Sequence, residues 1–185
     1  MRNGDSGSIA VSVNKLRAMH SQSAFSSERP GHEAVYAIDD SNGTVWQPAE
    51  TDGQPTLTLD LVAPTEFETN QFFVIDSARI EFAAGRGGGF GARGGAPTPP
   101  AASAPSGGVT AFRYKIEASI DGKEYATVLD KTKNDGTFYT EFDEIPPTRC
   151  RFVRLTITDW PRRGTTPLGI TEFTVFGKAA PAQMR

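Results

Sequence analysis

Apolar residues alternate with polar ones along several short stretches of this chain, and this two-residue period is the feature that most restricts its fold. The alternation is clearest in residues 56–61, 113–120, 153–158 and 173–175. Because successive side chains of a β-strand point to opposite faces, each stretch predicts a strand with one buried face. No long segment repeats apolar residues at i, i+3 and i+4, as an amphipathic helix would. The pattern predicts an all-β fold, an antiparallel β-sandwich.

Turn-forming residues separate these stretches. Asp121-Gly122, Asn134-Asp135-Gly136 and Pro146-Pro147 are the strongest signals, and each is expected to join two antiparallel strands.

Length and composition indicate one globular domain. The chain has 185 residues, a formal net charge of -3 and one cysteine, Cys150, so the core is expected to form without disulfides. The small net charge gives no overall attraction to nucleic acid or to an anionic membrane surface. No apolar run is long enough to span a membrane, and the first residues lack the apolar segment of a signal peptide.

Residues 84–110 interrupt the pattern. They contain nine glycines and four prolines but only one aromatic residue, Phe90. So few apolar side chains cannot offset the entropy lost on ordering, which predicts a flexible loop inserted between two strands. The arginines and glycines of residues 85–95 also resemble segments that bind RNA, but two arginines and one phenylalanine are weak support, and no nucleic-acid partner is expected.

Three blocks resemble the discoidin family, also called F5/8 type C domains. The first comprises residues 34–46 (AVYAIDDSNGTVW) and 57–61 (LTLDL), and the second is residues 114–125 (YKIEASIDGKEY). The third comprises residues 150–157 (CRFVRLTI) and 169–177 (GITEFTVFG).

The resemblance implies a discoidin-like jelly roll, similar to galactose-binding-like domains and family 32 carbohydrate-binding modules. It places the β-sandwich at residues 9–177, with a flexible segment at 1–8 and a tail at 178–185. In their detailed amino-acid sequence, the blocks further resemble accessory domains of family 43 glycoside hydrolases. The implied role is to bind plant-type polysaccharide for an attached catalytic domain in a secreted, periplasmic or cell-surface protein.

Oxygen-bearing side chains gather beside Gly43. Asp39, Asp40, Asn42 and Thr44 lie within six residues, a set that suits a hard cation such as calcium. The same residues could instead form a turn closed by Asx hydrogen bonds. The resemblance implies a structural calcium bound by side-chain and backbone oxygens of Tyr36, Asp39, Ser41, Thr44, Thr171 and Glu172.

Sugar binding needs an aromatic face and planar polar side chains, which are expected on the loops at one rim of the sandwich. Trp160 is the leading candidate because its loop is rich in Pro, Arg and Gly. Trp46 is expected to pack in the core instead. The two histidines could equally be ordinary surface residues. The full set of ligand candidates is His20, Phe25, Arg29, His32, Trp160, Arg162 and Arg163.

The sequence lacks the H-E-x-x-H, G-x-S-x-G and phosphate-binding motifs, so no enzymatic activity is expected. Two carboxylates act as a glycosidase pair only at particular separations in space. The sequence does not give such separations, so it does not exclude a pair of this kind. Two other functions remain open. The domain could brace a catalytic domain without a ligand of its own, or it could bind protein or lipid.

Replacing residues 85–108 by a short Gly/Ser linker should leave the free energy of unfolding nearly unchanged. The reason is that the cost of closing a surface loop grows only slowly with its length. Chemical denaturation of both proteins measures this. A large loss of stability would mean that the insertion packs against the domain.

Overall fold

The computed structural model describes residues 11–12, 23–62, 71–83, 111–136, 138–161 and 167–180, and the predicted insertion at 84–110 lies outside them. These residues form nine strands and one short 3-10 helix, η1. The elements are β1 (Val11–Ser12), β2 (Ser23–Phe25), η1 (Ala34–Ala37), β3 (Thr56–Asp60), β4 (Phe73–Phe82), β5 (Arg113–Ser119), β6 (Ala126–Asp130), β7 (Thr140–Cys150), β8 (Phe152–Asp159) and β9 (Ile170–Ala179).

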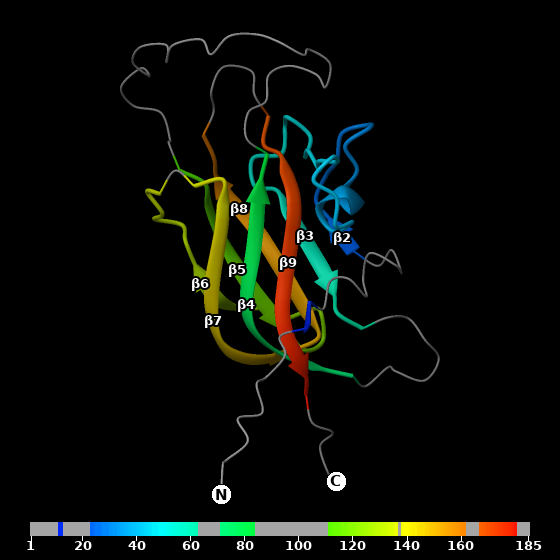
Figure 1. The fold of residues 1–185 in the computed structure, drawn as a ribbon, viewed down its shortest axis with the longest axis vertical. Coiled ribbons are helices and arrows are strands. Elements are labelled where there is room, and N and C mark those ends of the chain that lie inside the picture. The colour runs from blue at the N-terminus through cyan, green and yellow to red at the C-terminus, as the bar shows by residue number, and fades with distance from the viewer. Residues whose placement is uncertain are drawn as a thin grey trace, which may run out of the picture.

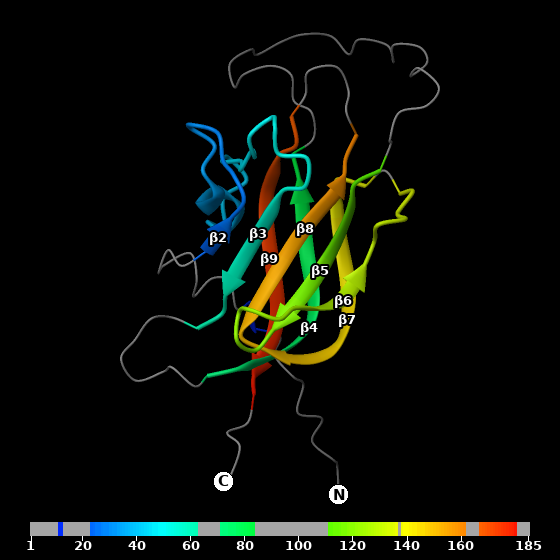
Figure 2. The same cartoon turned by 180° about the vertical axis from the view of Figure 1, so that it is seen from behind.

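The strands form two antiparallel sheets packed face to face, which confirms the predicted β-sandwich. One sheet has the order β1-β9-β4-β7, and the other has the order β2-β3-β8-β5-β6. Figure 1 shows β9, β4 and β7 in front, and Figure 2 shows β3, β8 and β5 from the other side. Strand β9 runs to Ala179, two residues beyond the predicted end of the sandwich.

The core contains the inward-facing residues that the two-residue period predicted. Leu57 and Leu59 on β3, Ile116 on β5 and Leu155 on β8 are all fully buried. The register pairs Leu57 with Leu155 and Leu155 with Ile116, so these side chains form one continuous row across the second sheet. The polar residues between them point to the other face of the sheet, where the Thr156 hydroxyl donates to the buried Glu117 carboxylate at 3.1 Å.

Pro146 and Pro147 do not form a turn between strands, as the sequence predicted, but lie inside β7. Their position is possible because β7 is the edge of its sheet, where the N–H group that proline lacks needs no partner. The β4–β7 register is irregular between Ile75 and Ser77, opposite the segment that contains the prolines. Asp121-Gly122 joins the antiparallel pair β5 and β6 as predicted, whereas Asn134-Asp135-Gly136 leads from β6 of one sheet to β7 of the other.

Residues 34–46 close one open side of the sandwich. Helix η1 contacts both β9 of one sheet and β2 of the other. The chain then forms a two-hydrogen-bond bridge, in which Trp46 and Ile170 exchange N–H···O contacts of 2.9 and 3.0 Å. The Trp46 side chain has 0% exposure, and its indole N–H donates to the Ser27 carbonyl at 3.1 Å. The expected packing of Trp46 is confirmed.

The lone cysteine is part of the core. Cys150 ends β7 and is fully buried, as its apolar surroundings in the sequence predicted. Burial raises the pKa of its thiol to about 12. No helix among the described residues is both long enough and apolar enough to cross a membrane.

Gly177→Ala should destabilise the fold by about 2–3 kcal/mol, as expected for overpacking. A Cβ atom at Gly177 would lie 2.8 Å from the Ile75 Cα atom and closer still to the Val74 carbonyl oxygen, and backbone atoms cannot move aside. Gly53→Ala is the matched control, because nothing lies within 4 Å of its Cβ position. Thermal or urea unfolding measures both. Equal stability of the two variants would contradict this packing.

Candidate functional site

The predicted cation-binding loop forms a compact cluster of oxygen atoms. The Thr44 hydroxyl lies 2.8 and 3.0 Å from the two carboxylate oxygens of Asp39 and 3.2 Å from the Ser41 carbonyl oxygen. The Ser41 N–H also donates to Asp39 at 3.0 Å, which is the Asx turn that the sequence offered as the alternative. Asp40 takes a φ of 59°, a left-handed conformation that aspartate tolerates better than most residues.

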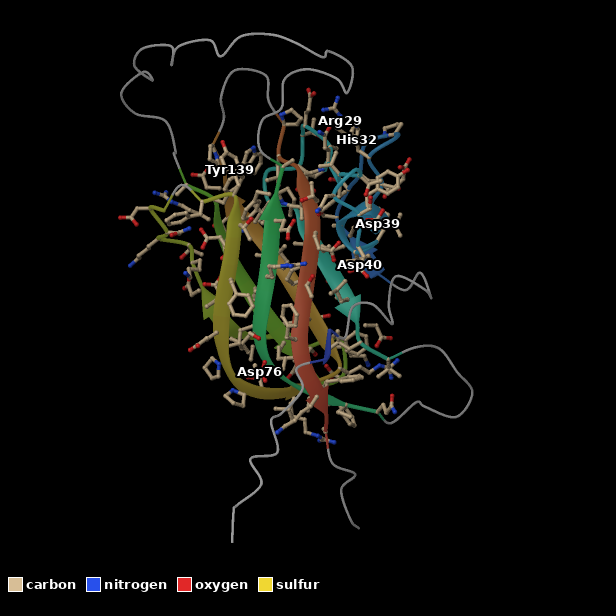
Figure 3. The ribbon with its side chains drawn as sticks, viewed as in Figure 1. Arg29, His32, Asp39, Asp40, Asp76 and Tyr139 are labelled. Atoms are coloured by element: carbon tan, nitrogen blue, oxygen red, sulfur yellow. The ribbon has the colours of Figure 1, made fainter. Side chains whose placement is uncertain are left out.

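Glu172 connects this loop to β9. Its side chain is buried, one carboxylate oxygen accepts the Asp40 N–H at 3.1 Å, and the other lies 3.3 Å from the Thr174 hydroxyl. Residues 132 positions apart in sequence therefore meet at one place. Figure 3 shows Asp39 and Asp40 beside β9, below the upper rim of the sandwich.

Thr171 is the residue where the β4–β9 register shifts, since Glu81 pairs with Glu172 and Phe82 with Ile170. A bulged residue makes no regular ladder contacts, and the Thr171 hydroxyl donates to the Glu81 carbonyl at 3.1 Å. Tyr36 lies in η1, and its ring hydroxyl interacts with Glu33, which raises the pKa of Tyr36. Only backbone oxygens of these two residues were predicted to bind the ion.

The chemistry of this donor set fits calcium, because carboxylate, hydroxyl and carbonyl oxygens of Asp39, Thr44 and Ser41 converge. No group of three or more His, Cys, Asp or Glu side chains forms a metal site in the described part of the chain. An ion bound here would depend on backbone and hydroxyl oxygens in addition to Asp39 and Glu172.

The upper rim brings together two of the predicted sugar ligands. Arg29 and His32 form an isolated antiparallel bridge across a tight turn, with a φ of 78° at Gly31. The guanidinium of Arg29 lies 3.5 Å from the Glu50 carboxylate. The His32 Nδ1 atom is 3.2 Å from the Val45 carbonyl oxygen, an acceptor, so Nδ1 is the ring nitrogen that donates to the backbone. Figure 3 places both residues at this rim.

The remaining predicted ligands are arranged differently. Phe25 is not in a loop but ends the edge strand β2, where its ring is exposed. Trp160 follows β8 in a loop, as predicted, but its ring is half-buried against the core and is not a freely exposed platform. His20, Arg162 and Arg163 lie outside the described residues.

Two aromatic residues that the sequence analysis missed are exposed at the same rim. Phe138 is 68% exposed and Tyr139 is 44% exposed, just before β7 begins. The Tyr139 ring packs edge-on against Phe112 with ring centroids 5.9 Å apart, and Phe112 in turn stacks on Phe82 at 3.8 Å. Figure 3 shows Tyr139 at the same end of the sandwich as Arg29 and His32. Two aromatics directly after the turn at residues 134–136 were the available sequence signal.

The loop that carries these aromatics is fixed by Asn134. Its side-chain amide donates to the Phe112 carbonyl at 3.0 Å and to Glu141 at 3.2 Å, and its Oδ1 accepts the Gly136 N–H at 3.2 Å. The Arg113 side chain donates to the Asn134 carbonyl at 3.2 Å. The Arg113 guanidinium thus lies between the Asn134 carbonyl and, at 3.9 Å, the Asp159 carboxylate.

Acidic residues under this rim have structural partners. Asp143 accepts a hydrogen bond from the Tyr114 hydroxyl and forms an ion pair with Lys131 at 2.8 Å. Burial and this hydrogen bond raise the pKa of Tyr114, and the carboxylate raises the pKa of Lys131. Glu141 accepts from Asn134. Asp143 thus links β7 to Tyr114 on β5 and to Lys131 just after β6, and Glu141 links β7 to the turn at Asn134.

Several solved structures share this fold. A putative chitobiase fragment from Bacteroides thetaiotaomicron aligns with a TM-score of 0.60 at 16% identity, covering 98% of this chain and 100% of that chain. The chain has the fold of carbohydrate-binding modules. CpGH89CBM32-5 from Clostridium perfringens, solved in complex with GalNAc-β-1,3-galactose, aligns with a TM-score of 0.53 at 18% identity, covering 83% and 93%.

A third neighbour is chitosan-binding module 1 of a chitosanase/glucanase from Paenibacillus sp. IK-5. It aligns with a TM-score of 0.54 at 21% identity and covers 84% of this chain and 93% of that chain. No protein-family model and no curated protein sequence matches the chain.

If calcium binds at Asp39, adding a chelator should lower the melting temperature by roughly 5–10 °C. An ion at about a hundred times its Kd stabilises the folded state by about 2.7 kcal/mol, and 1 kcal/mol shifts the melting temperature of a chain this size by about 2–4 °C. Asp39→Asn should abolish this response, whereas Asp135→Asn, an exposed acid in another loop, should keep it. Calorimetry with and without chelator measures the shift. If protein confirmed to be metal-free melts at the same temperature as protein with calcium, the calcium site is excluded.

Proposed function

We propose that this protein is a non-catalytic carbohydrate-binding module that contacts glycan with its upper rim. The observation that carries the proposal is the exposed aromatic pair Phe138 and Tyr139, which follows a turn anchored by the Asn134 side chain. Exposed rings offer a stacking surface to the C–H face of a sugar, and nearby planar polar groups can bind its hydroxyls. Arg29 and His32 at the same rim extend the polar part of the surface.

The ligand classes of the structural neighbours support this proposal. One neighbour is described in complex with GalNAc-β-1,3-galactose, and another is described as chitosan-binding. The resemblance of the sequence to accessory domains of family 43 glycoside hydrolases favours a plant-type polysaccharide instead. Xylan, arabinan, chitosan and galactose-terminated oligosaccharides are therefore the ligands to test first.

The calcium ion would have a structural role in this proposal. Asp39, Ser41 and Thr44 would hold it on the loop side, and Glu172 with the Thr171 carbonyl would hold it on the β9 side. An ion there adds positive charge between two carboxylates, Asp39 and Glu172, and so favours the closed arrangement of loop and strand. It would supply no catalytic chemistry and would lie away from the sugar-contacting rings.

The proposed context is a secreted, periplasmic or cell-surface glycoside hydrolase to which this module is attached. Tethering to polysaccharide would raise the local substrate concentration for the catalytic domain. The proposal includes no catalytic role for this chain itself. Its neighbours described as binding modules and the structural partners of Glu141 and Asp143 both favour that interpretation.

The exposed aromatics weigh against one of the two alternative functions, that of a domain that only braces a catalytic partner. A domain that only braces a catalytic partner needs no exposed rings on a fixed loop, although it could cover them with that partner. Lipid-binding relatives would need apolar side chains flanked by basic residues. The basic pair considered for that role, Arg162 and Arg163, lies outside the described residues.

Phe138→Ala and Tyr139→Ala should each weaken polysaccharide retention about tenfold or more, because an anchoring aromatic contributes at least about 1.4 kcal/mol to binding. Phe142→Ala is the matched control, since Phe142 is equally exposed but lies on the outer face of β7. Affinity gel electrophoresis against the four glycans measures retention. If Phe138→Ala and Phe142→Ala bind alike, the rim is not the glycan site.

The two tryptophans should separate binding from folding in the same assay. Trp46→Ala should cost about 3–5 kcal/mol of stability, as expected for a deleted core aromatic. Trp160→Ala should cost less because its ring is only half-buried, while also weakening retention. If folded Trp160→Ala protein is retained as strongly as the parent, Trp160 does not contact glycan. The role proposed for Phe138 and Tyr139 would be unchanged.

A further inference from the structure

A recess lies at the end of the sandwich opposite the aromatic rim. It has a volume of about 480 Å³ and is bordered by the β5–β6 turn and the end of β7. The registers define the two ends, because Ser119 pairs with Phe152 near the recess, whereas Arg113 pairs with Asp159 near the rim. Its lining includes the side chains of Ile120, Asp121, Glu124, Tyr125 and Arg149.

Two of these side chains give the recess an apolar surface in fixed positions. Ile120 is 49% exposed although it follows directly after β5. The Tyr125 ring is half-buried, and the guanidinium of Arg154 lies over it at 3.5 Å from the ring centroid. This cation–π contact holds the ring in place before any ligand arrives. An exposed isoleucine beside a fixed aromatic ring resembles the apolar part of a sugar-binding surface.

The polar groups of the recess are also held in position. One carboxylate oxygen of Asp121 accepts hydrogen bonds from the N–H groups of Lys123 at 2.9 Å and Glu124 at 3.1 Å, and from the Ser119 hydroxyl at 3.1 Å. The backbone bonds lower the pKa of Asp121, so it is charged at neutral pH. Within the described ranges, its second carboxylate oxygen makes no hydrogen bond, and Glu124 makes no ion pair.

Arg149 adds a donor on the other side of the recess. Its guanidinium lies over the Phe72 ring at 4.1 Å, which orients it without using its N–H groups. Among the residues that the structure describes, no carboxylate pairs with Arg149. The recess thus offers carboxylate acceptors on the β5–β6 turn and guanidinium donors on β7, with apolar contacts between them.

The balance of charges indicates which ligand this surface can take. The carboxylates of Asp121 and Glu124 balance the guanidinium of Arg149 and that of Arg154 on the Tyr125 ring, so the recess has no excess of positive charge for a phosphate, a sulfate or an acidic peptide. Sugar hydroxyls both donate to carboxylates and accept from guanidinium, and a pyranose ring presents a C–H face to apolar side chains. We infer that the recess of Ile120, Asp121, Glu124, Tyr125 and Arg149 is a second glycan site that binds one or two rings of a neutral or amino sugar.

Two sites at opposite ends would allow one module to hold two glycan chains at once. The gain in retention on a polymer would then exceed the affinity of either site, because the second contact is made at a high effective concentration. This inference goes beyond the proposed rim site and does not depend on it.

The test maps both sites by amide chemical shifts during titration with GalNAc-β-1,3-galactose, chitohexaose and xylohexaose, each to about 10 mM, the range of weak sugar contacts. At least one sugar should shift the amides of residues 119–126 and 148–149. Ile120→Ala/Glu124→Ala should weaken that response about tenfold and leave any response of residues 138–139 unchanged. Lys123→Ala, in the same turn but outside the recess, is the matched control.

Each outcome separates the two sites. No shift at residues 119–126 with any sugar, or an equal loss in Lys123→Ala, would overturn the second site. Shifts at the recess without shifts at the rim would support the second site and contradict the rim site proposed above. Shifts at the rim alone would support the rim site and overturn the second site. No shift at either place would overturn both sites.

Discussion

The contact between residues 38–46 and β9 is the interaction on which the rest of this structure depends. Trp46 and Ile170 exchange two backbone hydrogen bonds, and Glu172 accepts the Asp40 N–H two residues further along β9. The Trp46 ring is fully buried as part of the hydrophobic core. Because η1 contacts β9 and β2, this segment connects the two sheets where no strand pairing joins them.

The same segment also holds one side of the upper rim in place. The turn at Arg29–His32 is held by the backbone of Gln47, which follows Trp46 directly, and by the Val45 carbonyl. On the other side of the rim, Asn134 fixes the loop before β7 through Phe112. Polar side chains on one side and aromatic rings on the other are thus held by separate sets of hydrogen bonds, so each half can be altered without unfolding the other.

The sequence predicted the strands well because most of them have one buried face, which imposes the two-residue period. It misplaced Pro146 and Pro147 because a proline on an edge strand has the same composition signal as a proline in a turn. It missed Phe138 and Tyr139 for a related reason. In a sequence, an aromatic pair at the start of a strand is expected to be part of the core. Only the structure shows that one edge of the Tyr139 ring packs against Phe112 while the rest of the ring is exposed to solvent. The oxygen cluster at Asp39 was local and therefore predictable, whereas its link to Glu172 is set by the tertiary fold and was reached only through the family resemblance.

The buried thiol of Cys150 makes this domain its own reporter of unfolding. A thiol with a pKa near 12 and no solvent access cannot form the reactive thiolate while β7 stays in place. Labelling must wait for the end of β7 to detach, so the modification rate measures how often that edge strand opens. Since the proposed second glycan site includes Arg149 on this same segment, sugar bound there would slow the labelling. The rate of Cys150 modification would thus report glycan binding at this end of the sandwich, although Cys150 itself does not contact the glycan.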